Sequence, residues 1–505
     1  MATPVNTVKE SSAAVVTNAE QKLQIVEDLI AGTKNLVINE GKQKKKGKKS
    51  GKIPKDMLTP EIIEELRKQR EEKKRLKKDA LIAQGIDLDA DTHTPKYIKR
   101  QLLSIPYENN DISTIITLKI MTYNLLAQAL IRRTLFPDNG EILKWQKRSK
   151  VLIQELKDYD CDVLCLQEVD FVQYKTFWRP ELEKLGYETK FHRGNDKNHG
   201  ISIFYKRSLF NLIDLCLIDF DNEKSGNIQP RTITKNVGLI LGLVLRNDST
   251  KMITIGTAHL FWHPFGTYER TRQTFIVLSK SKEFEKRIQV LHPEIKKIWK
   301  FFAGDFNSQP YDAPYLSITS KPVKYDDRCM RVISCSTSFQ YSDLRNGGSG
   351  EKEEGGNVEK FGENQPKDPV PAEYIATEEQ QLLVKDIEEL HNRLPFRAIS
   401  LYSIGYKVVD PQNSGLDNDR NEPFFSNWAH TWRGLLDYIF FIKEWDIDTD
   451  CKELDTIPQF EKENNIRINK LLKLPHPEQM GQGQPRENEY PSDHLCMIAD
   501  ISLLE

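Results

Sequence analysis

The sequence predicts an α/β fold in which layers of strands and helices pack on one another. From about Leu102 to the C-terminus, short runs rich in β-branched and aromatic residues recur, as in strands. Longer segments with helical spacing of their apolar residues lie between several of these runs. No internal repeat is visible. Strand and helix patterns that alternate in this way are typical of a sheet covered by helices.

Eight short runs rich in β-branched and aromatic residues are predicted as strands. They are 117–124, 161–168, 200–205, 237–245, 252–260, 301–306, 435–442 and 494–504. Two amphipathic segments, 143–159 and 269–291, are predicted as helices. We expect one domain over 102–505, with a flexible acidic insert rich in glycine and proline at about 346–374.

The N-terminal part of the chain differs from the rest in charge. Residues 1–100 hold 22 lysines and arginines against 15 acids, although the whole chain has a net charge of −1. Eight of these lysines lie between Lys42 and Lys55, and residues 1–58 are predicted to be a disordered basic tail. Such a tail attracts phosphates or serves as a nuclear or nucleolar address, and the alternative is a solubilising tail.

Residues 59–101 are predicted as a charged helix followed by a linker. Thr59 is a suitable N-cap, Pro60 suits the first turn, and Gly85 is a stop signal. Acids come early and bases late in the segment, which matches the helix dipole. We expect a solvated helix between tail and body rather than a partner-binding helix.

Membrane and secretory functions are not expected. No apolar stretch approaches the roughly 18 to 20 residues that span a bilayer. The first residues lack the basic start and apolar stretch of a secretory signal, so we expect a protein of the nucleus, nucleolus or cytoplasm. Cys161 and Cys165 lie in a hydrophobic run and are predicted to be reduced core thiols rather than metal ligands.

Polar residues stand where several of the predicted strands begin or end. A buried carboxylate needs a cation, a hydrogen-bond partner or an exit to solvent. If these ends converge, they offer hard oxygen ligands without a thiolate cluster, which suits Mg²⁺, with Mn²⁺ also possible. The residues are Asn124, Glu168, His259, Asp305, Asn307, Asp437, Asp493 and His494.

Each of these residues has an ordinary structural interpretation when it is taken alone. An acid at a strand end is more often a capping or turn residue, and His259 on an apolar strand is more often a core histidine. The stronger signal is their order along the chain. Asn is followed by Gln-Glu, His, Gly-Asp-x-Asn, Asp-Tyr and finally Ser-Asp-His.

This order resembles the exonuclease-endonuclease-phosphatase superfamily from about Lys119 to Leu504. The segments MTYNLLAQ, CLQEVD, AHLFWHP, GDFNSQP, LLDYIF and SDHL are most similar to the nocturnin and carbon-catabolite-repression deadenylase branch, particularly yeast Ngl-type RNA exonucleases. The resemblance implies a DNase-like four-layered α/β sandwich, with two packed mixed sheets flanked by helices. It also implies a phosphodiester hydrolase that uses one or two metal ions.

The resemblance implies roles for the residues at the strand ends. Glu168 would anchor Mg²⁺, and Asp493 would complete a second metal site. Asp305 would deprotonate the attacking water. The amides of Asn124 and Asn307 would bind phosphate oxygens or hold Asp305.

Three histidine and carboxylate positions complete this implied catalytic group. His494 would stabilise the charged phosphate, and Asp437 would fix its tautomer. His259 would face the phosphate across the pocket.

Three further residues are implied to contact the substrate. Arg270 stands where the family has a basic phosphate contact, and its alternative is a helix-surface arginine. Trp432 stands where deadenylases stack an aromatic on a base, and its alternative is a core tryptophan. Pro264 matches the opposite wall of that base site.

The chain departs from the deadenylases at two positions and in one whole region. It has His263 where they have an acid, His199 where they have aspartate before Gly200, and no leucine-rich repeats. These differences concern poly(A) preference and recruitment rather than the metal and water machinery. Recruitment would then use another segment, such as the lysine-rich tail.

The leading hypothesis is a Mg²⁺-dependent 3′-to-5′ RNA exonuclease that releases 5′-nucleotides from a single-stranded 3′ end. The substrate would be a poly(A) tail or a ribosomal RNA precursor, and the tail would contact RNA-processing or pre-ribosomal partners. One alternative is a phosphatase for the 2′-phosphate of NADP(H), or another phosphoesterase on this fold. A second alternative is a catalytically silent RNA-binding scaffold.

Overall fold

The computed structural model describes residues 95–108, 112–131, 136–137, 139–338, 370, 373–445 and 456–505, and positions 68, 72 and 75. The elements named below belong to the unit from Pro95 to Glu505. The predicted tail and most of the predicted acidic insert lie outside the described residues. Within the predicted N-terminal helix, Lys68, Glu72 and Arg75 are helical.

A seven-stranded mixed sheet forms one layer. β2 and β3 are parallel and the other neighbouring strands are antiparallel. The order is β1 (Leu102–Ser104), β14 (Ile466–Leu472), β15 (Met497–Leu504), β2 (Thr114–Asn124), β3 (Val163–Asp170), β5 (His199–Lys206) and β4 (Tyr187–His192).

A six-stranded mixed sheet forms the second layer. β8 and β9 are parallel and the other pairs are antiparallel. The order is β10 (Phe396–Ser400), β13 (Asp437–Glu444), β9 (Lys297–Asp305), β8 (Asp248–Ala258), β7 (Val237–Leu245) and β6 (Phe210–Asp219). A separate hairpin consists of β11 (Asn427–Ala429) and β12 (Trp432–Gly434).

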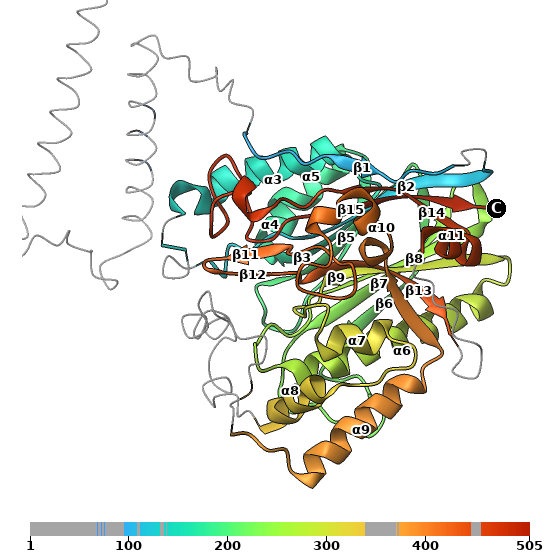
Figure 1. The fold of residues 1–505 in the computed structure, drawn as a ribbon. Helices are drawn as coiled ribbons and strands as arrows, with labels where there is room; N and C mark the ends of the chain where they lie inside the picture. Colours follow the sequence, from blue (N-terminus) through green and yellow to red (C-terminus); the bar gives the residue numbers. More distant parts are fainter. Residues whose placement is uncertain are drawn as a thin grey trace, which may run out of the picture. The chain divides into compact units, whose positions relative to one another are not determined.

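Helices cover the outer faces of the two sheets (Figure 1). The first sheet carries α3 (Trp145–Tyr159), α4 (Phe171–Gln173), a π-helical turn η3 (Tyr174–Trp178) and α5 (Arg179–Lys184). On the second sheet's side lie α6 (Thr267–Leu291), α7 (Ala313–Thr319), α8 (Asp327–Ser338) and α9 (Glu378–Asn392). The remaining helical segments are η2 (Gly140–Leu143), α10 (Leu401–Val409), η7 (Pro411–Asn413), α11 (Ile457–Asn464) and η8 (Pro477–Gln479).

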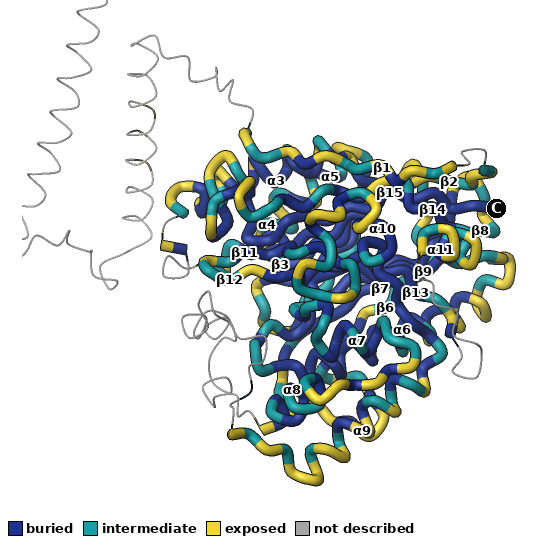
Figure 2. The backbone as a smooth tube through the Cα atoms, viewed as in Figure 1, coloured by how far each residue is buried: buried dark blue, intermediate teal, exposed yellow. Residues whose placement is uncertain are grey.

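The main core lies between the two sheets, where the chain is deeply buried (Figure 2). Neighbouring residues of a strand point to opposite faces, so Ile120 joins this core while Met121 packs in a second cluster with α3 residues such as Leu152. Cys161 and Cys165 are buried and free, as predicted. Within the described ranges, every helix is too short or too polar to span a bilayer.

The predicted sandwich of two mixed sheets flanked by helices is confirmed. The two predicted helices correspond to α3 and α6. β7 is buried on both faces, which explains why its sequence VGLILGLVL is apolar throughout rather than alternating.

Candidate active site

The polar strand ends meet at one edge of the two sheets. β2 and β3 are parallel, and Asn124 at the end of β2 lies opposite Gln167 in β3. In the second sheet, Asp305 at the end of β9 lies opposite Asp437 at the start of β13, and it also bridges to His259. The prediction that these distant segments converge is therefore confirmed.

Glu168 is aimed into the site by an irregular strand. The register of β3 against β5 shifts between Leu166 and Val169, and Glu168 has a φ of 52°, which is unusual for a residue with a side chain. Its Oε1 accepts a hydrogen bond from Asn124 Nδ2 at 3.1 Å, and its Oε2 accepts one from the Ala127 N–H at 2.8 Å. The bulge and these two donors fix the carboxylate.

Asp305 ends β9 and is only 1% exposed. Its Oδ2 accepts a hydrogen bond from Asn124 Nδ2 at 2.9 Å, and its Oδ1 accepts one from the Asn307 N–H at 2.9 Å. Asn307 has a φ of 46°, and its Nδ2 donates to the Leu260 carbonyl at 3.0 Å. The tight turn after β9 therefore holds the carboxylate of Asp305.

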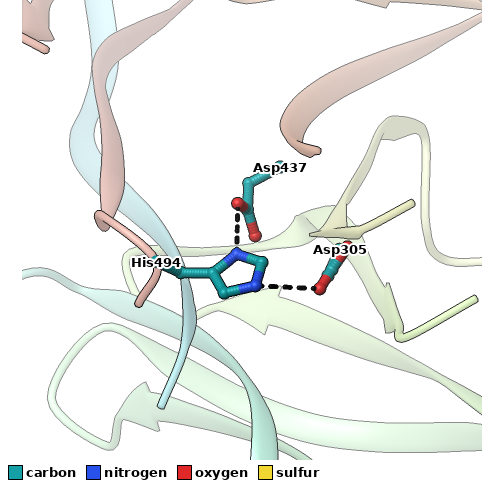
Figure 3. Close-up of side chains that lie close together, drawn as sticks. All are labelled: Asp305, Asp437 and His494. Carbon is teal, nitrogen blue, oxygen red and sulfur yellow. Dashed lines mark hydrogen bonds and ion pairs between the residues drawn. The ribbon is translucent and has the colours of Figure 1, made fainter. Parts of the chain in front are cut away.

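His494 lies between two buried carboxylates (Figure 3). Its Nδ1 is 2.8 Å from Asp437 Oδ2, and its Nε2 is 3.6 Å from Asp305 Oδ2. Burial disfavours the charged ring, but the charges of Asp437 and Asp305 outweigh burial and raise the pKa of His494 well above its usual value. The ring is therefore an imidazolium held between two acids.

Burial also raises the pKa of Asp305 to about 7, with the charge of His494 opposing the rise and that of Asp437 adding to it. The ligand-type atoms of Asp305, Asp437 and His494 lie within 4.8 Å of one another. We interpret this trio as a catalytic group in which the ring of His494 bridges two carboxylates.

Glu168 and Asp493 are two buried or half-buried carboxylates that line the cavity described below. Burial raises the pKa of Glu168, and the nearby charge of Asp493 adds to that rise. Burial raises the pKa of Asp493 as well. The buried guanidinium of Arg148 donates to backbone carbonyls rather than to either acid. Two desolvated carboxylates of this kind fit a hard cation with oxygen ligands.

His259 faces the site rather than the core. Its Nε2 is 3.5 Å from Asp305 Oδ2, and its Nδ1 is 4.0 Å from Glu168 Oε1. Its backbone carbonyl accepts a hydrogen bond from Asn236 Nδ2 at 2.8 Å. The alternative of a core histidine is therefore wrong.

A cavity of about 260 Å³ opens beside these groups and contains Trp432 and Pro264 in its lining. Trp432 is half-buried in β12, and a side chain added to Gly434 would meet its ring at 2.8 Å. Gly434 therefore gives the indole room beside the cavity. Trp432 is therefore not a core tryptophan, which was the alternative.

Arg270 is buried, with 4% exposure, so the alternative of a helix-surface arginine is wrong. Its guanidinium lines the cavity, and it donates to the carbonyls of Phe261 and His263 and to Thr267 Oγ1. These bonds hold the loop that carries Pro264. Its predicted contact with phosphate stays a prediction.

Several cavity residues were not predicted from the sequence. Trp262, Gln309 and Leu436 stand inside the segments AHLFWHP, GDFNSQP and LLDYIF, so the motifs could have indicated them. The others come from a turn, from helices α6 and α8 and from strand β11, where no motif marks them. They are Thr267, Tyr311, Asp312, Arg328, Val332, Asn427 and Ala429.

Comparisons with known proteins agree with this geometry. The sequence matches the model of the Endonuclease/Exonuclease/phosphatase family over residues 121–494. It is 52% identical over 476 residues to the RNA exonuclease NGL2 of Saccharomyces cerevisiae. That alignment covers 91% of this chain and 92% of NGL2. It is 39% identical over 472 residues to the probable RNA exonuclease NGL3 of the same yeast, with 90% and 91% covered.

Solved structures show the same fold. The crystal structure of ANGEL2, a 2′,3′-cyclic phosphatase, in complex with adenosine-2′,3′-vanadate aligns with a TM-score of 0.51 at 22% identity. The alignment covers 80% of this chain and 99% of ANGEL2. The family model matches most of the chain, and the chain is 52% identical to NGL2 over most of its length. The chain therefore belongs to the endonuclease/exonuclease/phosphatase family, whose hydrolases act on phosphodiester bonds.

Proposed function

We propose that the chain is a 3′-to-5′ RNA exonuclease that releases 5′-nucleotides by in-line attack of water. The observation that carries this proposal is the pairing of Glu168 and Asp305 through Asn124, beside a cavity that contains Trp432. The two yeast relatives named as RNA exonucleases support RNA as the substrate.

Asp305 acts as the general base in this proposal. Burial raises its pKa to about 7, which is close to the value at which a base is effective near neutral pH. Asn124 and Asn307 hold the carboxylate in one orientation, so that its free lone pairs face the water. The proton of the water passes to Asp305 as the water oxygen attacks phosphorus.

His494 supplies fixed positive charge to the phosphoryl group. The imidazolium is held by Asp437, which itself accepts a hydrogen bond from Ser426 Oγ at 2.7 Å. A preorganised donor of this kind stabilises the charge that develops on phosphoryl oxygens. His259 faces the same space and is proposed to donate to another phosphate oxygen.

Glu168 and Asp493 would hold a magnesium ion, with manganese as a substitute. When bound there, the ion would neutralise the scissile phosphate and stabilise charge on the leaving oxygen. Asn124 and the Ala127 N–H keep the Glu168 carboxylate oriented for this purpose.

Trp432 and Pro264 are proposed to bind the base of the terminal nucleotide from two sides. Stacking of a base on an aromatic ring contributes on the order of 1 to 3 kcal/mol and tolerates different bases. This tolerance suits a single-stranded 3′ end, either a poly(A) tail or a ribosomal RNA precursor. Arg270 is proposed to hold this wall and to contact phosphate.

The domain arrangement is proposed as a catalytic body over 102–505, preceded by a charged helix and linker over 59–101 and a basic tail over 1–58. The lysines of the tail are proposed to bind RNA and RNA-processing partners in the nucleus or nucleolus. Deletion of residues 1–58 should leave kcat unchanged, weaken RNA binding and reduce the dependence of that binding on salt. If the deletion leaves RNA affinity and cellular distribution unchanged, the tail acts only as a solubilising segment.

The decisive experiment uses a 5′-labelled RNA oligonucleotide with Mg²⁺. Asp305→Asn and Glu168→Gln should each abolish hydrolysis and leave the thermal unfolding midpoint nearly unchanged. Asp386→Asn is the matched control, because Asp386 is exposed on α9. Substantial hydrolysis by Asp305→Asn would refute its role as the base.

The products identify the reaction class. Mass spectrometry should find 5′-nucleotides released stepwise from the 3′ end. Incubation with NADPH under the same conditions tests the phosphatase alternative, for which inorganic phosphate would be the product. An absence of both products would favour the silent scaffold.

A further inference from the structure

A second hollow lies next to the active site, on the side away from Trp432. It is a notch of about 20 Å³ that Lys197, Lys235 and Asn236 help to line, and it shares His259 with the larger cavity. The strand order explains its position. β5 lies next to β3 and β7 lies next to β8, whereas β9 and β13 lie on the other side of β8.

The loop before β5 extends this basic region. The Arg193 guanidinium carbon lies 3.9 Å from the centre of the Phe171 ring, and Lys175 Nζ lies 4.0 Å from it. The Phe171 N–H donates to the Asn198 carbonyl at 2.7 Å, so this cluster adjoins Lys197. Lys175 belongs to the π-helical turn η3, a geometry frequent at functional sites. We call the set Phe171, Lys175, Arg193, Lys197 and Lys235 the 5′-side surface.

The backbone beneath this surface is fixed. Lys235 has a φ of 54°, and its N–H donates to Asp221 Oδ2 at 2.6 Å. A side chain added to Gly194 would lie 2.2 Å from the Lys235 carbonyl oxygen, so the two segments touch and only glycine fits. Asn236 connects the same segment to the carbonyl of His259. The backbone segment that carries Lys235 is therefore connected to the active site by a hydrogen bond.

The charges of this surface suit a polyanion. Lys235 forms no ion pair with any residue in the part of the chain that the structure describes. In the larger cavity, by contrast, Arg328 pairs with Asp312 at 3.0 Å. The 5′-side surface carries four basic side chains, and the exposed Asp196 is the acid on its loop. Lysines bind phosphates, and the guanidinium plane of an arginine that lies over an aromatic ring can stack on a base.

The direction of the RNA follows from the proposed exonuclease reaction, on which this inference rests. The bond that breaks joins phosphorus to the 3′-oxygen of the penultimate nucleotide, and the bond that forms joins phosphorus to the water oxygen. Asp305 takes the proton of the water, and the leaving oxygen takes a proton from solvent to become the new 3′-hydroxyl. In-line attack places the two oxygens on opposite sides of phosphorus. With the water beside Asp305 on β9, the remaining RNA continues past Glu168 on β3.

We propose that the 5′-side surface binds the single-stranded RNA upstream of the scissile bond. Lys197 and Lys235 contact the phosphates of the nucleotides that precede the terminal one, and the guanidinium of Arg193, which lies over the Phe171 ring, stacks on a base. The terminal nucleotide occupies the cavity at Trp432. A dinucleotide is too short to reach the whole surface, so the surface favours longer RNA.

A series of RNAs of two to six nucleotides tests this proposal. For the wild-type chain, kcat/KM should rise with length. The double variant Lys197→Ala/Lys235→Ala should raise the KM for the hexanucleotide about tenfold and leave the dinucleotide unaffected. The slope of log affinity against log salt should fall by about 0.7 for each lysine removed.

The matched control is Lys286→Ala/Lys407→Ala, which removes two exposed lysines from α6 and α10. Binding of 5′-fluorescein hexanucleotide is measured by anisotropy in EDTA, so that the result does not depend on hydrolysis. Equal losses for the dinucleotide and the hexanucleotide, or unchanged hexanucleotide affinity, would overturn the proposal. If the wild-type chain cleaves neither RNA, the exonuclease proposal fails, and the anisotropy measurement still decides whether this surface binds RNA.

Discussion

Glu168 and Asp305 accept hydrogen bonds from the same nitrogen atom. Asn124 Nδ2 lies 3.1 Å from Glu168 Oε1 and 2.9 Å from Asp305 Oδ2. An amide nitrogen carries two hydrogens and can serve both carboxylates. Because the amide is neutral, it fixes the separation of the two acids without neutralising them. Both charges stay available, one for a cation and one for the proton of water.

Asn124→Ala should lower kcat by about 100-fold, because supporting groups that orient ligands and bases contribute effects of this size. Single-turnover hydrolysis of labelled RNA measures the change. Asn469→Ala is a matched control, since Asn469 is an asparagine of β14 that bonds to Asp500 and Ser502 rather than to the site. Activity within twofold of wild type would show that the shared amide has no catalytic importance.

Asp437→Asn should reduce kcat by about a thousandfold or more, because the ring of His494 loses the carboxylate that holds it charged and oriented. The Ser426 hydroxyl keeps a partner in this variant, so the fold should be preserved. A stopped-flow rate measurement gives the effect, and the NMR shifts of the His494 ring report its protonation. A ring that remains charged in the variant would contradict the explanation.

Trp432→Ala should raise the KM for RNA about tenfold or more while leaving the hydrolysis of a phosphodiester without a base unchanged, since only stacking is lost. Trp432→Phe retains an aromatic face and should lie close to wild type. Comparable losses on both substrates in the alanine variant would indicate a structural role.

His391 should make the stability of the fold depend on pH. Burial, with the charge of Arg397 adding, lowers the pKa of this α9 residue to about 3. An unfolded chain takes up the proton near pH 6.5, whereas the folded chain does not, so stability falls as the pH drops below 6.5. Between pH 6.5 and 5 the loss should be about 2 kcal/mol.

Urea unfolding at several pH values measures this effect. His391→Gln keeps an amide donor for the Thr271 carbonyl, which lies 3.1 Å from His391 Nε2, but it cannot titrate. The variant should therefore lose less stability than the wild-type chain over this pH range. Parallel losses in the two proteins would exclude His391 as the cause.

The edge strands show the limit of local sequence patterns. The eight predicted strands are all present, but β1, β4, β6 and β10 at the sheet edges were not predicted. β4 reads YETKFH and is mostly half-buried, so its apolar residues are too few to give a clear pattern. The interior strand β14, IRINKLL, was also missed because charged residues interrupt it. Neighbouring strands supply the hydrogen bonds that such segments need.

Arg270 shows the same limit at the site. Its spacing on an amphipathic helix fits a surface position, but α6 is covered by other elements and its guanidinium binds loop carbonyls. Asn236 and the 5′-side surface likewise carry no motif. The closeness of Lys235 and Asn236 to His259 comes from the pairing of β7 with β8.

By itself, the sequence determined the α/β class and the polar residues that end its apolar strands, because both are written in local hydrophobic patterns and short motifs. Only the tertiary structure decided that Asn124 joins Glu168 to Asp305, that His494 is held between two acids, and that basic residues flank His259. These relationships depend on strand pairings between segments far apart in the chain, and no local pattern encodes the distance between two side chains.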